Sequence, residues 1–462
     1  MNKYKKLLSN SAVFAIGNLG SKMITFFMVP LYTRYLTTSE YGKSDLFSTL
    51  VSLLTPILTL SIIDAVFRFA MDGSSNNDEV LTNSFIVSGI SILLFLFLLP
   101  VLSNVPYAIY IGILTYASAL ESMLQQFARG IGKSKLYAST GILMTIVTVI
   151  SNIVLIVLFG WRLNGYLFSM LLAQIAGFVY LFIILRGWRY IHKKSINFVL
   201  TKKMLVYSIP IIPNTVSWWL SNSANKIFIS VMLGTSANGI YAVANKIPSL
   251  ISVFVTIFTQ AWQISAVEEY KSRDSSKFFS EIMNLTVGLL FIAVAVLTLF
   301  SKPIVAILST PAYYGAWKIV PWLALAVLYS SLSSFLGTIY TSSMQTKYLF
   351  TTTLFGAITN ILANLVLIPW MGLSGAGIGA CLAFVVVSFL RLRDSKKFIK
   401  LNVHKFDWFS SQALFFAELV TLYLFSGMFS YIVALIFTMS IVFINRRIFV
   451  LMIITLRNRI KR

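Results

Sequence analysis

A lysine lies in the middle of the first long apolar segment, residues 11–32. Roughly 20 mostly apolar residues span a bilayer as a helix, so Lys22 is expected close to the bilayer centre. A charge at that depth costs about 2.5–3.5 kcal/mol on insertion scales and normally faces a bundle interior or a water-filled cavity. At the helical repeat, Ser11, Asn18, Lys22 and Thr25 lie within about 60° of one another. We therefore predict a polar stripe on this helix, with a cation able to bind an anionic group.

Later predicted helices carry similar polar stripes. Asn222 and Lys226 lie four residues apart on the seventh helix, and Lys246 lies on the eighth. Lysines suit a pyrophosphate because they are compact charges on flexible stems, whereas hydroxyl and amide groups suit sugars. The stripes contain Asp45, Ser48, Ser52 and Thr59 on the second helix, Ser118, Glu121 and Gln125 on the fourth, Asn214, Trp218, Ser221 and Asn225 on the seventh, Asn245, Ser249, Ser252, Thr256, Thr259 and Gln263 on the eighth, and Ser334, Thr338, Thr341 and Gln345 on the tenth.

Each of these features also has a purely structural explanation. Small polar residues hold membrane helices together. Lys22 has two candidate ion-pair partners, Asp64 and Glu121, and both carboxylates are equally candidates for ion coupling. Arg68 and Arg129 lie at predicted cytoplasmic helix ends, where a pyrophosphate would enter, but the bias of positive charge toward the cytoplasm explains them as well.

The composition indicates a polytopic helical membrane protein. The 462 residues are 58% hydrophobic and 11% charged, whereas a soluble domain carries about 25% charged residues. The single cysteine, Cys381, cannot form an internal disulfide, and the two histidines, His192 and His404, lie in basic loops. We predict no metal site and no cofactor. The basic N-terminus followed by a long apolar run is interpreted as the first membrane helix, not a signal peptide.

The distribution of basic residues predicts the orientation in the membrane. With the N-terminus inside, the cytoplasmic segments hold 29 Lys and Arg residues and the outside loops hold 5. By the positive-inside rule, both termini are cytoplasmic. We predict fourteen membrane helices, with twelve as the alternative because the last two are short. They are expected at residues 10–32, 43–65, 82–102, 105–128, 138–159, 163–185, 207–232, 239–264, 281–300, 317–342, 350–370, 373–391, 409–426 and 428–446.

The two halves of the chain repeat each other. The segment Leu36–Gly42 aligns with Leu233–Gly239 at an offset of 197 residues, and Lys135, Thr140, Asn152 and Gly160 match Lys347, Thr352, Asn364 and Gly372 at an offset of 212. Six helices per half make the repeats parallel, related by an axis along the membrane normal. The predicted domains are an N-terminal lobe (1–185), a basic linker (186–206), a C-terminal lobe (207–391), a basic loop (392–408), and a helix pair with a basic tail (409–462).

Three segments resemble bacterial polysaccharide flippases of the Wzx type, in the multidrug/oligosaccharidyl-lipid/polysaccharide exporter superfamily. They are Phe14–Gly20 (FAIGNLG), Leu31–Gly42 (LYTRYLTTSEYG) and Asn360–Gly379 (NILANLVLIPWMGLSGAGIG). The resemblance implies two six-helix bundles forming a V around a cationic cavity. It also implies alternating access that moves an undecaprenyl-pyrophosphate-linked oligosaccharide outward, with Lys22 and Lys226 at positions of charged residues in the family.

The predicted function is therefore a flippase for lipid-linked oligosaccharide in the bacterial cytoplasmic membrane, not an enzyme. The predicted cavity residues are Lys22, Lys226, Lys246, Asn18, Asn222, Asn225, Trp218, Gln125 and Gln263. A polysaccharide polymerase complex and an H⁺ or Na⁺ gradient are candidate partners; nucleic acid is not expected. Alternatives are a lipid II flippase, a drug exporter, and a membrane polymerase or ligase. The run Gly-x-x-x-x-Gly-Lys-[Ser/Thr] is missing from the sequence, which gives no support for coupling to ATP.

Overall fold

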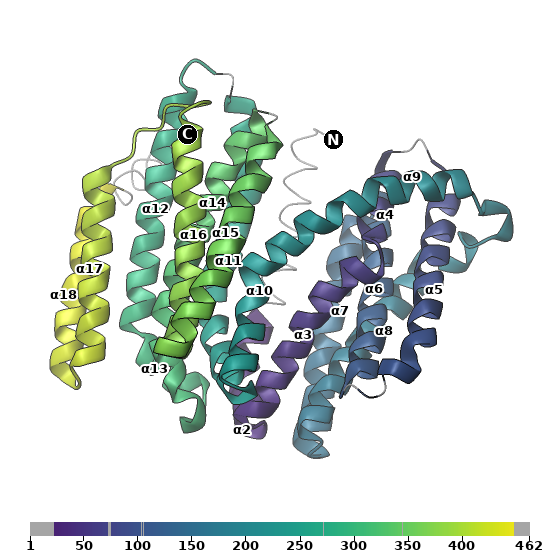
Figure 1. The fold of residues 1–462 in the computed structure, drawn as a ribbon, viewed down its shortest axis with the longest axis horizontal. Helices are drawn as coiled ribbons and strands as arrows, with labels where there is room; N and C mark the ends of the chain where they lie inside the picture. Colours follow the sequence, from purple (N-terminus) through teal and green to yellow (C-terminus); the bar gives the residue numbers. More distant parts are fainter. Residues whose placement is uncertain are drawn as a thin grey trace, which may run out of the picture. The chain divides into compact units, whose positions relative to one another are not determined.

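The computed structural model describes residues 23–72, 75–102, 104, 106–270, 272–343 and 345–447, and every regular element within them is a helix. The chain divides into two units, Met1–Trp219 and Leu220–Arg462 (Figure 1). The predicted stripe residues Ser11, Asn18 and Lys22 lie outside the described residues. The all-helical membrane fold predicted from the sequence is confirmed.

Each predicted membrane segment contains a helix within its described residues, and α9 and α13 are helices that the sequence did not predict. The first unit contains α2 (Val29–Tyr35), α3 (Thr38–Leu58), α4 (Ile62–Asp72), α5 (Asn77–Leu102), α6 (Ala108–Gly130), α7 (Ser134–Asn152) continued by the π-helix η1 (Ile153–Leu158), α8 (Arg162–Leu185), the short η2 (Gly187–Arg189) and η3 (Lys193–Ser195), α9 (Phe198–Ser208) and η4 (Ile209–Ile211). The helix α10 (Ile212–Met232) contributes residues to both units. The second unit contains α11 (Thr235–Glu269), α12 (Ser275–Leu299), α13 (Ser301–Leu308), η5 (Pro311–Lys318), α14 (Val320–Ser342), α15 (Thr346–Met371), α16 (Leu373–Ser395), α17 (Lys405–Leu424) and α18 (Met428–Ile444).

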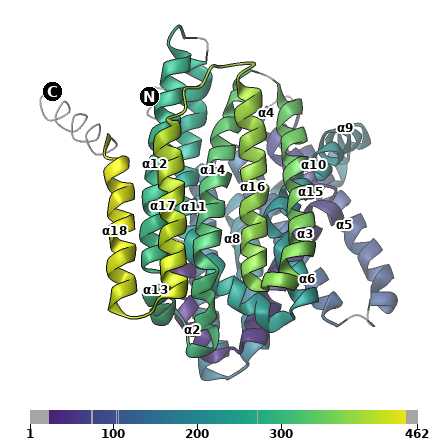
Figure 2. The same cartoon turned by 60° about the vertical axis from the view of Figure 1, so that its left-hand side comes forward.

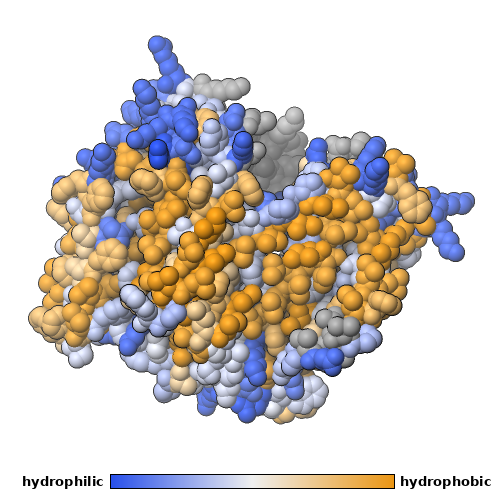
Figure 3. All heavy atoms as spheres, viewed as in Figure 1, coloured by the Kyte–Doolittle hydropathy of each residue, from blue (hydrophilic) through white to orange (hydrophobic). Residues whose placement is uncertain are grey.

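A helix lies at each of the fourteen predicted places within the described residues. Eight helices there are long and apolar enough to cross a membrane, or nine if the bent pair α3 and α4 forms one span. The face shown in Figure 3 has wide apolar areas on both units. Phe97 on α5 and Trp370 on α15 are 83% and 85% exposed, as expected for side chains that face lipid. The chain is a multi-pass membrane protein.

The second predicted span is broken. Pro56 lies in the last turn of α3, and α3 and α4 meet at 62°. Leu60 and Ser61 between them have positive φ angles of 52° and 50°. Ser91 of α5 donates a hydrogen bond to the Leu58 carbonyl, one of the acceptors that the break leaves without a helical donor. The helix is thus fully interrupted after Pro56, whereas α11 continues through Pro248.

Paired residues of the internal repeat occupy equivalent places within each unit. Gly160 and Gly372 both follow a long helix and have φ angles of 66° and 57°, which glycine adopts without the steric penalty of a side chain. Asn152 donates to the Tyr32 hydroxyl at 2.9 Å, and Asn364 donates to Asn225 at 2.7 Å. Each asparagine therefore joins the fifth predicted helix of its half to the first.

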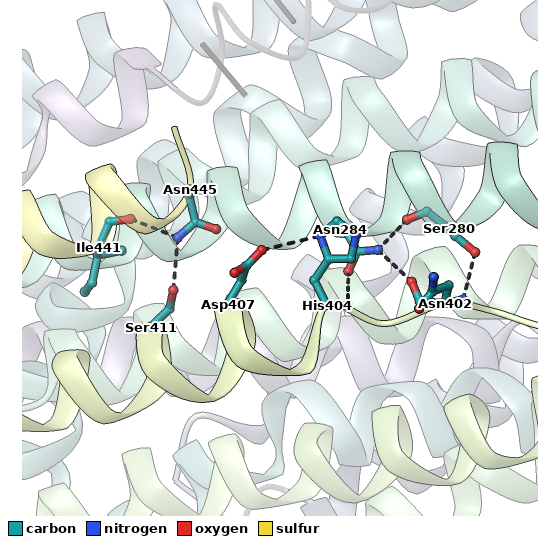
Figure 4. A network of polar contacts seen from close by, with 8 residues as sticks. All are labelled: Ser280, Asn284, Asn402, His404, Asp407, Ser411, Ile441 and Asn445. Carbon is teal, nitrogen blue, oxygen red and sulfur yellow. Dashed lines mark hydrogen bonds and ion pairs between the residues drawn. The ribbon is translucent and has the colours of Figure 1, made fainter. Parts of the chain in front are cut away.

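A further repeated contact was not predicted. Asn83 on α5 donates to the Ser195 carbonyl at 3.1 Å and accepts from the Asn197 amide at 3.0 Å. In the second unit, Asn284 on α12 forms the same pair of hydrogen bonds with the segment between α16 and α17 (Figure 4). It donates to the carbonyl of Asn402 at 2.8 Å and accepts from the amide of His404 at 3.1 Å. In each half, an asparagine of the third predicted helix thus forms hydrogen bonds with two residues, at positions i and i+2, of the connector, the segment that follows the sixth predicted helix.

The segment predicted as a basic linker (186–206) contains a helix that the sequence did not predict. Its last part is the helix α9, which Asn197 caps by accepting a hydrogen bond from the Leu200 amide at 3.0 Å. Leu200 and Met204, one turn apart, are buried in a cluster with residues of α4, α5, α6 and α8. The sequence did not predict a buried pair here, because the surrounding segment is rich in lysine and arginine. The linker therefore packs on the first unit.

We expect Asn83→Ala to loosen this connector. The change removes the partners of a half-buried carbonyl and a half-buried amide. A fully buried polar group without a partner costs about 1–3 kcal/mol, which is the upper bound for each. Limited trypsin digestion in membranes should then cut after Arg189, Lys193 or Lys194 at least several times faster than in the wild type. Asn245→Ala, at an exposed position of α11, is the control. Equal cleavage of both variants would show that Asn83 does not hold the connector.

The second unit is built around α14. Its helix α14 packs on α11, α12 and α16, and α15 packs on α16. The pair α17 and α18 packs on α12, as Figure 2 shows. A fully buried arginine, Arg391 of α16, donates to Thr352 and Thr353 of α15 at 3.0 Å each. It also donates to the Ser333 carbonyl of α14 at 2.7 Å, which joins the three helices.

Candidate functional site

A cavity of about 440 Å³ lies within the first unit, among residues of the first helical segment and of α6, α7 and α8. Its polar lining includes Thr25, Glu121, Gln125, Tyr166 and Gln174. The sequence predicted Thr25, Glu121 and Gln125 as polar stripe residues, and the fold brings them to one cavity. The predicted stripe of Lys22 ends at Thr25, so the described end of that stripe faces this space.

Glu121 is the carboxylate of this lining. Its side chain is 3% exposed, and one carboxylate oxygen accepts from Ser122 at 3.4 Å. The other oxygen, Oε1, has no hydrogen-bond partner among the described residues, and neither has Oε1 of Gln174. Gly177 on α8 leaves room for Glu121, since a Cβ there would lie 3.0 Å from the glutamate Cγ. The carboxylate oxygen of Glu121 can accept a proton, and both oxygens can coordinate a cation.

A second cavity, of about 400 Å³, lies within the second unit between α11 and α14. We call it the hydroxyl groove. It is lined by Ser252, Thr256, Thr259 and Gln263 from α11, by Ser330, Ser331 and Ser334 from α14, and by Val255. The stripes predicted on the eighth and tenth helices therefore meet, with Gln263 among the lining residues. Ser330 and Ser331 were missed, although Ser331 is three residues before the predicted Ser334.

Asn225 lies in a buried network, not on a cavity surface. It is 2% exposed, and its amide donates to the Tyr241 hydroxyl at 3.3 Å and to the Ala376 carbonyl at 3.4 Å. Its carbonyl oxygen accepts from Asn364, which also donates to Asn360. The network joins α10, α11, α15 and α16. Contacts between helices therefore explain why Asn225 of the predicted stripe is an asparagine.

The other predicted cavity residues lie on α10 and α11. Lys226 and Lys246 are half-buried, and Trp218 is 37% exposed. The backbone of Asn222 belongs to α10, but its side chain lies outside the described residues. Two partly accessible lysines therefore lie on the consecutive helices α10 and α11.

The predicted entrance arginines lie near each other. Arg129 ends α6 with its guanidinium 4.6 Å from the centre of the Phe67 ring, and Arg68 is the next residue along α4. Both arginines and Asp64 are exposed. Among the described residues, neither Asp64 nor Glu121 forms an ion pair, so a lysine partner for either carboxylate stays a prediction. A charge-based sequence analysis could find these residues, but not the neutral Gln174.

Comparisons with known proteins agree with this architecture. Residues 7–263 match a family model described as "Polysaccharide biosynthesis protein". An uncharacterized membrane protein of Methanocaldococcus jannaschii, MJ1375, is 24% identical over 424 residues, which cover 85% of this chain and 100% of that protein.

Solved structures share the fold. The lipid II flippase MurJ, in an inward closed conformation, matches with a TM-score of 0.70 and 14% identity over 96% of this chain and 100% of that chain. An inward-facing MATE family multidrug resistance transporter of the MOP superfamily matches with a TM-score of 0.67 and 15% identity, over 83% of this chain and 98% of that chain. The chain thus has the helical fold found in these transporters.

Proposed function

Because the chain belongs to the polysaccharide biosynthesis protein family, we propose that it moves undecaprenyl-pyrophosphate-linked oligosaccharide from the inner to the outer leaflet by alternating access. The transported repeat units would serve surface polysaccharide biosynthesis. The observation that carries this proposal is the pair of half-buried lysines, Lys226 and Lys246, on helices that also carry hydroxyl and amide groups. Partly buried cations suit a pyrophosphate, and hydroxyl and amide groups suit sugars.

In this proposal the three intramembrane lysines, Lys22, Lys226 and Lys246, bind the pyrophosphate. Arg68 and Arg129 attract it at the cytoplasmic entrance. The exposed Trp218 offers a surface on which a sugar can pack, and Asn18, Asn222, Gln125 and Gln263 supply hydrogen bonds. Asn225, which is already bonded to Tyr241 and Asn364, would position α10 instead of touching the substrate directly.

A gradient of H⁺ or Na⁺ is the proposed energy source, with Glu121 as the coupling group. The carboxylate is buried in a cavity and has an oxygen without a described partner. A buried carboxylate in a membrane protein is costly and is normally retained for function. Asp64 is the second candidate, on the exposed side of α4.

The proposed location is the bacterial cytoplasmic membrane, with both termini in the cytoplasm, and the proposed activity is transport without catalysis. The fold alone does not separate this proposal from a lipid II flippase or a drug exporter, because both folds match. The intramembrane lysines favour an anionic substrate. A polymerase or ligase usually needs catalytic groups in an outside loop, and the longest predicted one, residues 301–318, contains no carboxylate and no histidine.

We expect Lys22→Ala to abolish surface polysaccharide while the protein still folds and inserts, because the first-helix cation would be lost. The assay is the sidedness of radiolabelled lipid-linked repeat units in a host deletion strain that expresses each variant. The labelled lipid should accumulate on the inner leaflet with Lys22→Ala and reach the outer leaflet with the wild type and with Lys43→Ala, a lysine of α3. Normal polymer with Lys22→Ala would remove Lys22 from the mechanism. Outer-leaflet lipid that stays unpolymerised in the deletion strain would instead favour the polymerase alternative.

A further inference from the structure

The hydroxyl groove differs in charge from the cavity that contains Glu121. None of its eight lining side chains is ionisable, and seven of them carry a hydroxyl or amide group. Its volume of about 400 Å³ falls within the ~300–1,000 Å³ of pockets that enclose small molecules. A pyrophosphate needs cationic donors, which this lining lacks. The groove is therefore suited to a neutral and strongly hydrogen-bonding ligand.

The polar side chains of the groove do not hold its two helices together. Thr256 donates to the Ser252 carbonyl at 2.7 Å, and Ser331 donates to the Val327 carbonyl at 2.6 Å, each within its own helix. Among the described residues, no hydrogen bond joins a lining side chain of α11 to one of α14. Helix association through hydroxyl groups would show such bonds. Hydroxyls that donate to their own helix keep lone pairs that can accept from a ligand.

Aromatic packing beside the groove holds the two helices at their spacing. Trp262 of α11 stacks on Phe335 of α14 with 4.5 Å between ring centres. The Trp262 indole also donates to the Thr338 hydroxyl at 3.0 Å. Trp262 and Phe335 are 4% and 2% exposed, so they brace the helices and leave the adjoining Gln263 and Ser334 at the groove. The space is thus built into the packing of the second unit.

Sugars present many hydroxyl groups, each able to donate and accept, and they carry no charge unless modified. A wall of hydroxyl oxygens with one amide complements them. Building on the function proposed above, we propose that the hydroxyl groove binds uncharged sugar residues of the lipid-linked oligosaccharide. The lysines would bind the pyrophosphate at a separate subsite. The second unit would therefore recognise the sugar residues of the substrate as well as its lipid pyrophosphate.

The test compares two probes on protein in lipid nanodiscs free of glycoside detergents, whose sugar headgroups would compete. One probe is undecaprenyl pyrophosphate linked to a neutral disaccharide, and the other is undecaprenyl pyrophosphate alone. Removing one neutral hydrogen bond weakens binding roughly 2- to 10-fold. The double variant Thr259→Val/Ser334→Ala should therefore bind the disaccharide lipid roughly 10-fold more weakly, and the sugar-free lipid as the wild type does.

The control variant Thr286→Val/Ser440→Ala removes the same two groups on α12 and α18, outside the groove lining, and should bind both probes normally. Equal binding of the disaccharide lipid by both double variants would overturn the proposal, and so would an equal loss for both probes. If the wild type binds neither lipid, the proposed transport function fails. Saturation-transfer NMR with the free disaccharide then tests sugar binding in the groove separately. A signal that the wild type shows and Thr259→Val/Ser334→Ala loses supports sugar binding there, and the absence of a wild-type signal rejects it.

Discussion

Replacing Arg391 by alanine is expected to lower the melting temperature of the purified protein by about 6–12 °C. The guanidinium is 1% exposed and donates to Ser333, Thr352 and Thr353 on two other helices. Removing it leaves buried acceptors without donors, at about 1–3 kcal/mol each, and leaves a cavity as well. A loss of about 3 kcal/mol shifts the melting temperature of a domain of this size by roughly 6–12 °C.

The control is Arg393→Ala, two residues further along α16, where the side chain is exposed. It removes the same charge and should melt within about 1 °C of the wild type, since exposed substitutions usually have small effects. Arg391→Lys should lie between the two, because one ammonium cannot reproduce the planar set of donors. A fluorescence melting curve in detergent measures all three variants. If Arg391→Ala melts like Arg393→Ala, the buried network does not stabilise the second unit.

Replacing Glu121 by glutamine is expected to remove the dependence of transport on an ion gradient. The substitution keeps the shape of a side chain that is 3% exposed and faces the cavity of the first unit, but removes its charge. Coupling between two sites is typically worth 5- to 150-fold. Transport of lipid-linked oligosaccharide into the outer leaflet of proteoliposomes should therefore fall by roughly that factor under an imposed H⁺ or Na⁺ gradient.

Glu418→Gln gives a matched control, because Glu418 of α17 is also a fully buried carboxylate. It does not line the cavity of the first unit. It should keep the response to the gradient. A Glu121→Gln protein that still transports faster with the gradient would assign coupling to another group, with Asp64 next to test.

The positions of the helices could be predicted from the sequence because each needs an apolar run long enough to cross a bilayer. The internal repeat could also be detected, because Gly160 and Gly372 fill places where the backbone turns with positive φ. The same signals failed where burial depends on distant partners. The helix α9 lies in a basic segment, and only its packing on α4 and α5 reveals the role of Leu200 and Met204.

The candidate site shows the same division. The sequence by itself determined a polytopic helical membrane protein with hydroxyl, amide and lysine residues on particular helix faces, because hydropathy and helical periodicity are local. Tertiary structure decided which faces meet: Thr259 meets Ser334 across a groove, whereas Asn225 meets Asn364 in a closed network. It also decided that Arg391, the last residue of a predicted membrane helix, is buried among hydroxyl groups of two other helices. The physical reason is that burial of a polar group depends on partners supplied by other helices, and no single segment contains them.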